Sequence, residues 1–268
     1  MANKFFREAN ILELTNRCNN YCVICQDNPV QGEVMKSFPE LKNEVNYFVS
    51  RGTKMISIYG GEPYLNKNID KILEYIGQFN IACNISTNAR IFSYEPIVKN
   101  LRKLKRVSVI TTLFSRKKDI HEYITDTPSS YNQTIRGIKN LIKVGIPLVV
   151  TITITKKNVN DLLATVRFLK QLGVKVIKIS GLINQGRVVN RHDLLPAFTV
   201  VKDEISKAVD FSQGKDIELI FEKLPICVAS AMAGKFKYEA QHKQTMLICP
   251  PNLDQCPKCD VKFNCMCF

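Results

Sequence analysis

The chain has 268 residues with a formal net charge of +14 at pH 7, and 45% of its residues are hydrophobic. This length suffices for one sizeable domain with its own core and a small appendage. No stretch approaches the ~18 uncharged apolar residues that a membrane helix needs, and charges interrupt the start where a signal peptide would be apolar. We therefore expect a cytoplasmic protein that has no membrane partner.

Strand-like and helix-like segments alternate along the chain. Short segments rich in β-branched and apolar residues predict strands at 9–14, 54–59, 81–86, 107–112, 148–155, 174–179 and 217–221. Apolar residues at helical spacing predict helices at 69–79, 96–103, 131–144, 159–172 and 196–211.

This alternation favours an α/β fold with βαβ units and a parallel sheet. Six strand–helix units up to Ile179 suit an incomplete, curved (β/α)6 barrel better than a closed eight-fold barrel. From about Pro225 the chain becomes rich in Cys, Pro and Lys and loses its periodicity. We therefore expect a partial barrel over residues 1–224 and a small Cys-rich region over residues 225–268.

Most of the ten cysteines lie in two groups. Three fall within residues 18–25 and five within residues 249–267, and the other two are Cys83 and Cys227. In a reducing cytoplasm, clustered cysteines indicate metal binding or redox chemistry rather than disulfides. Cys83 stands in the middle of a predicted strand, where a small core residue is the better explanation.

The first group, Cys18, Cys22 and Cys25, has the spacing C-x3-C-x2-C directly after the first predicted strand. Three thiolates on one loop can ligate three irons of a [4Fe–4S] cluster and leave the fourth iron open. An open iron can chelate the amino and carboxylate groups of S-adenosylmethionine (SAM), whose reductive cleavage yields a 5′-deoxyadenosyl radical. Zinc is the alternative metal, but it prefers four ligands and usually pairs two C-x-x-C units.

This loop resembles the signature of the radical SAM superfamily, which follows the first strand of a partial barrel. The resemblance covers about residues 11–183. It implies a SAM-binding [4Fe–4S] cluster, SAM itself, and a cellular electron donor such as a flavodoxin or ferredoxin. The chain departs from the signature at Ile24, where the family commonly has an aromatic residue, so the contact with the adenine of SAM is unassigned.

The segment Tyr59, Gly60, Gly61 and Glu62, followed by a proline, ends the second predicted strand. Adjacent glycines allow the backbone to approach a ligand closely, although the segment alone is also a plausible tight turn. At this position it resembles the second motif of the superfamily, which holds the amino group of SAM. Glu62 is open to a second interpretation, in which it only braces the turn.

Other candidate cofactor contacts lie near the ends of later strands. Ser86 and Asn88 match a stretch that approaches SAM in relatives, although such residues also cap helices well. Thr112 and Thr153 stand at the carboxyl ends of strands, which line the ligand mouth of barrels. Arg187 could pair with the carboxylate of SAM or with the substrate, and the alternative is a solvated surface arginine.

The second cysteine group contains Cys256, Cys259 and Cys265 in C-x2-C-x5-C spacing, with Cys227 upstream in Leu-Pro-Ile-Cys. A tail this short, with few large apolar residues, needs a metal to hold it together. Four thiolates would suit either zinc or a further [4Fe–4S] cluster.

The spacing of this tail resembles the Cys-rich modules of radical SAM peptide maturases, of the SPASM or twitch type and the HxsC-like enzymes. The resemblance implies an auxiliary [4Fe–4S] cluster on the four cysteines just named. Cys249 and Cys267 would be reserve or second-site ligands, and Cys267 takes a place where those relatives often have glycine.

The leading functional hypothesis is a radical SAM enzyme that abstracts hydrogen from a ribosomally made peptide in an oxidative modification or crosslink. Recognition of a leader peptide would then have to come from the barrel, from the tail or from a separate binding protein, because the first predicted strand begins at residue 9. The alternatives are a radical SAM dehydrogenase of a small metabolite, a tRNA-modifying enzyme, and a non-enzymatic zinc or iron–sulfur module. The basic residues are spread along the chain, which disfavours nucleic acid as a partner. No catalytic residue can be assigned from the sequence.

Overall fold

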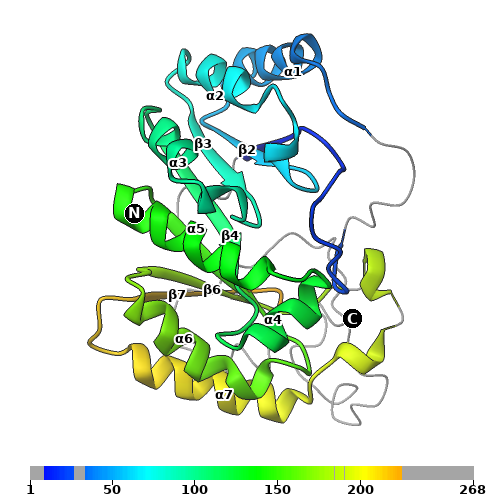
Figure 1. Ribbon diagram of the computed structural model, residues 1–268, viewed down its shortest axis with the longest axis vertical. Coiled ribbons are helices and arrows are strands. Elements are labelled where there is room, and N and C mark those ends of the chain that lie inside the picture. The colour runs from blue at the N-terminus through cyan, green and yellow to red at the C-terminus, as the bar shows by residue number, and fades with distance from the viewer. Residues whose placement is uncertain (1–8, 27–33, 184, 190, 225–268) are drawn as a thin grey trace. The chain divides into compact units, whose positions relative to one another are not determined.

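The computed structural model describes residues 9–26, 34–183, 185–189 and 191–224. They form an α/β fold in which parallel strands alternate with helices (Figure 1). These residues divide into two compact units. The first contains residues 9–21, 34–111 and 129–148, and the second contains residues 22–26, 112–128 and 149–224.

The first unit is a set of parallel strands joined by helical crossovers, as parallel pairing requires. Its strands are β1 (Ala9–Glu13), β2 (Met55–Tyr59), β3 (Ala82–Ser86) and β4 (Val107–Thr112). Its helices are α1 (Phe38–Ser50), α2 (Ile69–Gly77), α3 (Glu95–Arg102) and α5 (Ser130–Val144).

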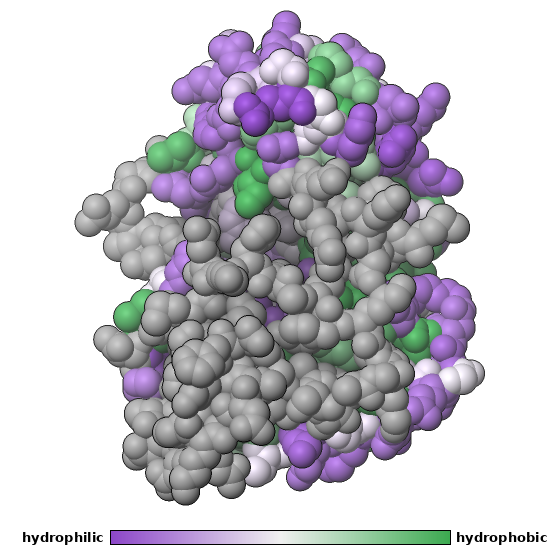
Figure 2. Space-filling model, turned by 180° about the vertical axis from the view of Figure 1, so that it is seen from behind, coloured by the Kyte–Doolittle hydropathy of each residue, from purple (hydrophilic) through white to green (hydrophobic). Residues whose placement is uncertain are grey.

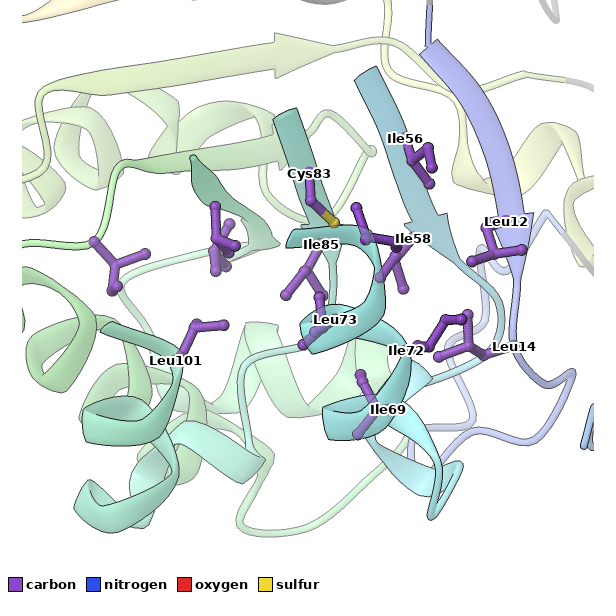
Figure 3. Close-up of a cluster of buried hydrophobic side chains, with 14 of the residues drawn as sticks. Leu12, Leu14, Ile56, Ile58, Ile69, Ile72, Leu73, Cys83, Ile85 and Leu101 are labelled. Carbon is purple, nitrogen blue, oxygen red and sulfur yellow. The ribbon is translucent and has the colours of Figure 1, made fainter. Parts of the chain in front are cut away.

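The core of the first unit lies between these strands and helices (Figure 3). Ile58 and Ile85 are fully buried on neighbouring strands and pack with Leu73 of α2. The residues that alternate with these isoleucines point to the opposite face of the strands. On that face Ser57 of β2 is the register partner of Asn84 of β3. The strands therefore present an apolar face to the helices and a polar face on the opposite side.

The second unit repeats this arrangement. Its strands are β5 (Leu148–Thr153), β6 (Val176–Ser180) and β7 (Glu218–Glu222), and its helices are α4 (Lys118–Thr125), α6 (Leu162–Gln171) and α7 (Phe198–Ser212). The polar face of β6 and β7 contains an ion pair, in which Lys178 Nζ lies 3.3 Å from Glu222 Oε2, and both side chains are about nine-tenths buried.

The predicted strands and longer helices are confirmed in type and approximate position. Six predicted strands precede residue 181, and the further strand predicted at 217–221 is β7, which pairs in parallel with β6. Two helices, α1 and α4, were not predicted from apolar periodicity. A local signal for α1 was present, since Ser37 and Glu40 form a capping box at its start. The Cys-rich region predicted at 225–268 lies outside the described residues.

The helices of both units are amphipathic rather than uniformly apolar. On the face of the molecule in Figure 2, the described residues show mostly hydrophilic side chains, with smaller hydrophobic areas among them. Within the described parts of the chain, no helix combines the length and apolar character needed to span a membrane.

Candidate cofactor site

The cysteine loop follows the carboxyl end of β1, the end at which parallel α/β folds bind ligands. Cys18 belongs to the first unit, whereas Cys22 and Cys25 belong to the second, and all three are half-buried. Among the residues that the structure describes, no three His, Cys, Asp or Glu side chains converge on one metal position. The fit of this loop to an iron–sulfur cluster therefore rests on its donor chemistry, since cysteine thiolates are the usual ligands of such clusters.

In the first unit, the turn after β2 contacts the segment that leads into the cysteine loop. The backbone N–H of Gly61 donates to Thr15 O at 2.8 Å, and that of Glu62 donates to Arg17 O at 2.7 Å. A Cβ atom on Gly61 would lie only 2.2 Å from Arg17 O, so no other residue fits without moving the backbone. Gly61 therefore allows a close contact within the chain itself, and the predicted contact of this glycine pair with SAM stays a prediction.

Glu62 braces this turn from inside. Its side chain is 1% exposed, and its two carboxylate oxygens accept hydrogen bonds from Thr87 Oγ1, Asn88 N and Tyr64 N at 2.9 to 3.2 Å. Burial raises the pKa of Glu62 above its ordinary value of 4.5, and these hydrogen bonds oppose the shift. The contacts match the second interpretation of Glu62, in which it connects the turn after β2 with the segment after β3.

Asn88 extends the network to the cysteine loop. Its Nδ2 donates to Asn19 Oδ1 at 2.6 Å, and its Oδ1 accepts from Arg90 N at 3.0 Å. Thr134 of α5 donates to Asn88 O at 3.0 Å, which fixes the backbone at this position. The predicted candidate Asn88 therefore contacts the residue that follows Cys18 in the sequence.

In the second unit, the loop between Cys22 and Cys25 is held by its backbone. Val23 N donates to Ile124 O of α4 at 2.9 Å. Arg187 N donates to Cys25 O at 2.8 Å, and Arg187 Nη1 approaches Cys22 O at 3.4 Å. Arg187 is half-buried, and its guanidinium contacts the cysteine loop, whereas its contact with SAM or a substrate stays a prediction.

Gly186 and Ile24 complete the support of this half of the loop. Gly186 has a φ of +62°, and a Cβ atom there would lie 2.4 Å from Cys25 O and 2.3 Å from Gln26 O. Ile24 is 7% exposed and packs in an apolar cluster that includes Val188. The residue that departs from the family signature is therefore a core residue of the second unit.

The other predicted contacts lie at the carboxyl ends of their strands. Tyr59 and Ser86 in the first unit, and Thr112 and Thr153 in the second, are all half-buried. Their contact with a cofactor stays a prediction. The predicted tail ligands lie outside the described residues, namely Cys227, Cys249, Cys256, Cys259, Cys265 and Cys267.

The fold and the loop together define a class of protein, a parallel α/β protein with a three-cysteine loop after its first strand. Residues 12–193 match the sequence model of the Radical SAM superfamily. The chain therefore belongs to the Radical SAM superfamily, and this membership implies a [4Fe–4S] cluster and SAM.

Two sequence relatives and one solved structure illustrate the range of this family. An AdoMet-dependent heme synthase of Methanosarcina barkeri is 26% identical over 194 residues, which cover 69% of this chain and 53% of that protein. A GTP 3′,8-cyclase of Clostridium botulinum is 28% identical over 243 residues, covering 81% of this chain and 74% of that protein. Streptococcus suis SuiB bound to SAM has the same fold, with a TM-score of 0.69 and 16% identity, over 85% of this chain and 53% of SuiB. The chain thus spans about half the length of the heme synthase and of SuiB.

Glu62→Gln should change how stability depends on pH. Because folding raises the pKa of Glu62, the folded chain holds this proton more tightly than the unfolded chain. The stability that this group contributes is therefore full below about pH 4.5 and decreases as the pH rises toward the folded pKa. We expect the free energy of unfolding of the wild type, measured in urea, to fall relative to the Gln variant above that pH. Parallel pH curves for the two proteins would contradict this assignment.

Gly186→Ala should displace the half of the loop that carries Cys25. The new Cβ would overlap two backbone carbonyl oxygens, so we expect a destabilisation of about 1–3 kcal/mol and less iron bound per chain after reconstitution.

Gly214→Ala is the matched control for this variant. Gly214 has a similar φ of +66°, but no atom lies within 4 Å of its added Cβ. Strain alone should lower the free energy of unfolding by about 1 kcal/mol without reducing bound iron. Equal iron content in the two variants would show that Gly186 does not position the loop.

Proposed function

We propose that this chain is a radical SAM enzyme whose SAM-binding [4Fe–4S] cluster is held by Cys18, Cys22 and Cys25. The observation that carries the proposal is the three-cysteine loop after β1, which lies within the family match and is anchored by its backbone in each unit. When bound, the cluster and SAM supply a 5′-deoxyadenosyl radical, which can abstract hydrogen from a substrate.

The residues of the chain would support the cysteine loop and position SAM and the substrate. In this proposal the Gly60–Gly61 turn offers backbone groups to the amino group of SAM, and Glu62 keeps that turn in place from its buried position. Arg187 holds the carbonyl groups of the loop. Four half-buried side chains at strand ends would contact SAM or the substrate, namely Tyr59, Ser86, Thr112 and Thr153.

The substrate that we favour is a ribosomally made peptide, oxidised or crosslinked after hydrogen abstraction. Two observations support this choice. SuiB, which shares the fold, has been solved with its precursor peptide SuiA, and the cysteine spacing of the tail resembles that of peptide maturases. The proposal includes an auxiliary cluster on Cys227, Cys256, Cys259 and Cys265, a flavodoxin or ferredoxin as electron donor, and a separate leader-peptide-binding protein.

A small metabolite is the second candidate substrate. The observation that favours it is the sequence similarity to GTP 3′,8-cyclase, which extends over 81% of this chain. In that case the same radical chemistry would act on a compound that enters at the carboxyl ends of the strands.

Production of 5′-deoxyadenosine tests the proposed activity. Anaerobically reconstituted wild type, reduced in the presence of SAM, should release 5′-deoxyadenosine and methionine, measured by liquid chromatography. The combined substitution of Cys18, Cys22 and Cys25 by Ala should abolish both products.

Cys83→Ala is the matched control, because Cys83 is 3% exposed and burial raises the pKa of its thiol to about 12, so it is not a thiolate at neutral pH. This variant should retain the iron of the wild type and its activity. Product formation that survives the triple substitution would overturn the proposal.

The choice between the two substrate classes can be made with the same reaction. If a peptide is the substrate, a precursor peptide encoded near the gene should accelerate 5′-deoxyadenosine release and lose two hydrogen atoms, as measured by mass spectrometry. GTP and other small metabolites should have neither effect. Acceleration by a metabolite and not by the peptide would replace the first candidate by the second.

A further inference from the structure

Arg90 contacts the two residues that follow Cys18. Its Nη1 donates to the backbone oxygen of Asn19 and, at 2.8 Å, to Oδ1 of Asn20. Its Nε donates to Oε1 of Gln133, on α5, at 2.6 Å. All of these residues belong to the first unit, so one guanidinium connects the segment after β3, helix α5 and the first part of the cysteine loop.

The two loop residues that Arg90 contacts, Asn19 and Asn20, make further hydrogen bonds. Asn20 is 7% exposed, and its backbone N–H lies 3.4 Å from the Sγ atom of Cys18, within hydrogen-bonding distance of sulfur. Asn88 Nδ2 donates to Asn19 Oδ1 at 2.6 Å. The orientation of the peptide that donates to the Cys18 sulfur is therefore fixed by side chains 69 and 70 positions further along the chain than the residues they contact.

The chemistry of arginine suits this task. Its planar fork presents several N–H donors in a fixed geometry, and here two of its nitrogens donate in different directions. Lysine would retain the charge but could not reproduce the fork. Glutamine would remove the charge. These differences allow charge and geometry to be separated experimentally.

We propose that Arg90 is a positioning residue that raises the reduction potential of the cluster at Cys18. This inference rests on the proposed function, because it requires a cluster on the three loop cysteines. Hydrogen bonds to cluster sulfurs and nearby charge both set the potentials of such clusters. The guanidinium adds positive charge near the loop and fixes the N–H donor of Asn20, and both effects favour the reduced, more negative cluster.

The alternative role for Arg90 is simple support of the loop. A support role predicts lower stability and less bound iron, but an unchanged potential in the chains that do hold a cluster. The midpoint potential therefore distinguishes the two roles, whereas an activity assay alone would not.

The experiment is a redox titration followed by electron paramagnetic resonance (EPR) on reconstituted full-length protein. The signal of this cluster is defined as the one missing when Cys18, Cys22 and Cys25 are all replaced by Ala. Arg90→Gln should lower its midpoint potential enough to change the reduction equilibrium about tenfold, which is about 59 mV for one electron. Arg90→Lys should give a smaller shift in the same direction.

Arg106→Gln is the matched control, since it removes the same charge from the same unit. Arg106 is exposed, precedes β4, and donates from Nη1 to Asn80 Oδ1 at 3.3 Å. This variant should leave the potential unchanged. Iron content and unfolding temperature, measured on every variant, show how much cluster and folded protein each one retains.

Each outcome has a distinct meaning. If no signal in the wild type depends on the three cysteines, the proposed function fails. If that signal is present and Arg90→Gln has the same potential as Arg106→Gln, the inference about Arg90 fails alone. If Arg90→Gln holds no cluster, Gln133→Ala decides, because it removes only the partner that orients Arg90. A lowered potential in Gln133→Ala would support the inference, and an unchanged potential would overturn it.

Discussion

The first unit depends on a backbone contact between the turn after β2 and the chain that leaves β1. Gly61 approaches Arg17 O so closely that a Cβ atom on Gly61 would lie 2.2 Å from this oxygen. The backbone N–H groups of Gly61 and Glu62 donate to the backbone oxygens of Thr15 and Arg17. The route of the chain into the cysteine loop is therefore set by main-chain atoms, which cannot change conformation as a side chain can. Glu62, buried behind the turn, connects it to the segment after β3 through three donors. An unpaired buried carboxylate would be costly, so the turn and its brace stabilise each other.

The two ends of the cysteine loop are anchored by different means. At Cys18 the supports are side chains, chiefly Asn88 and Arg90. At Cys22 and Cys25 they are mainly backbone groups, which come from α4 and from the segment around Arg187. Such anchoring suits a site that must hold thiolates in position. Hydrogen bonds from the residues around metal ligands orient those ligands and tune the reduction potential of the metal.

Local patterns in the sequence were enough to predict the alternation of strands and helices. Runs such as Met55–Tyr59 are short, β-rich and bounded by glycine, and helices such as α2 place apolar residues on one face. Helix α1 was not predicted because it buries only two side chains, Leu41 and Val45, over its 13 residues, although its Ser37–Glu40 capping box is visible in the sequence. Helix α4 was not predicted because two of the three side chains that it buries, His121 and Thr125, are polar and give no apolar pattern.

Only those parts of the site that belong to a local sequence motif could be predicted. The cysteine spacing and the Gly60–Gly61 pair are local, so they can be found in the sequence. Arg90 and Gln133 form no motif, since the bond from Arg90 to Asn20 joins residues 70 positions apart. Arg187 was proposed from its place after the sixth strand, but its contact with Cys22, 165 positions away, could not be foreseen. Long-range contacts of this kind arise from tertiary packing and leave no signal in local sequence.

The most direct test of this account is whether SAM binds to the cluster itself. The reduced wild-type protein should be examined by EPR with and without SAM, with the triple cysteine variant used to identify the signal of this cluster. The account predicts that SAM changes the g values of that signal, because three thiolates leave one iron open for the amino and carboxylate groups of SAM. Identical spectra with and without SAM, from protein fully loaded with iron, would contradict it.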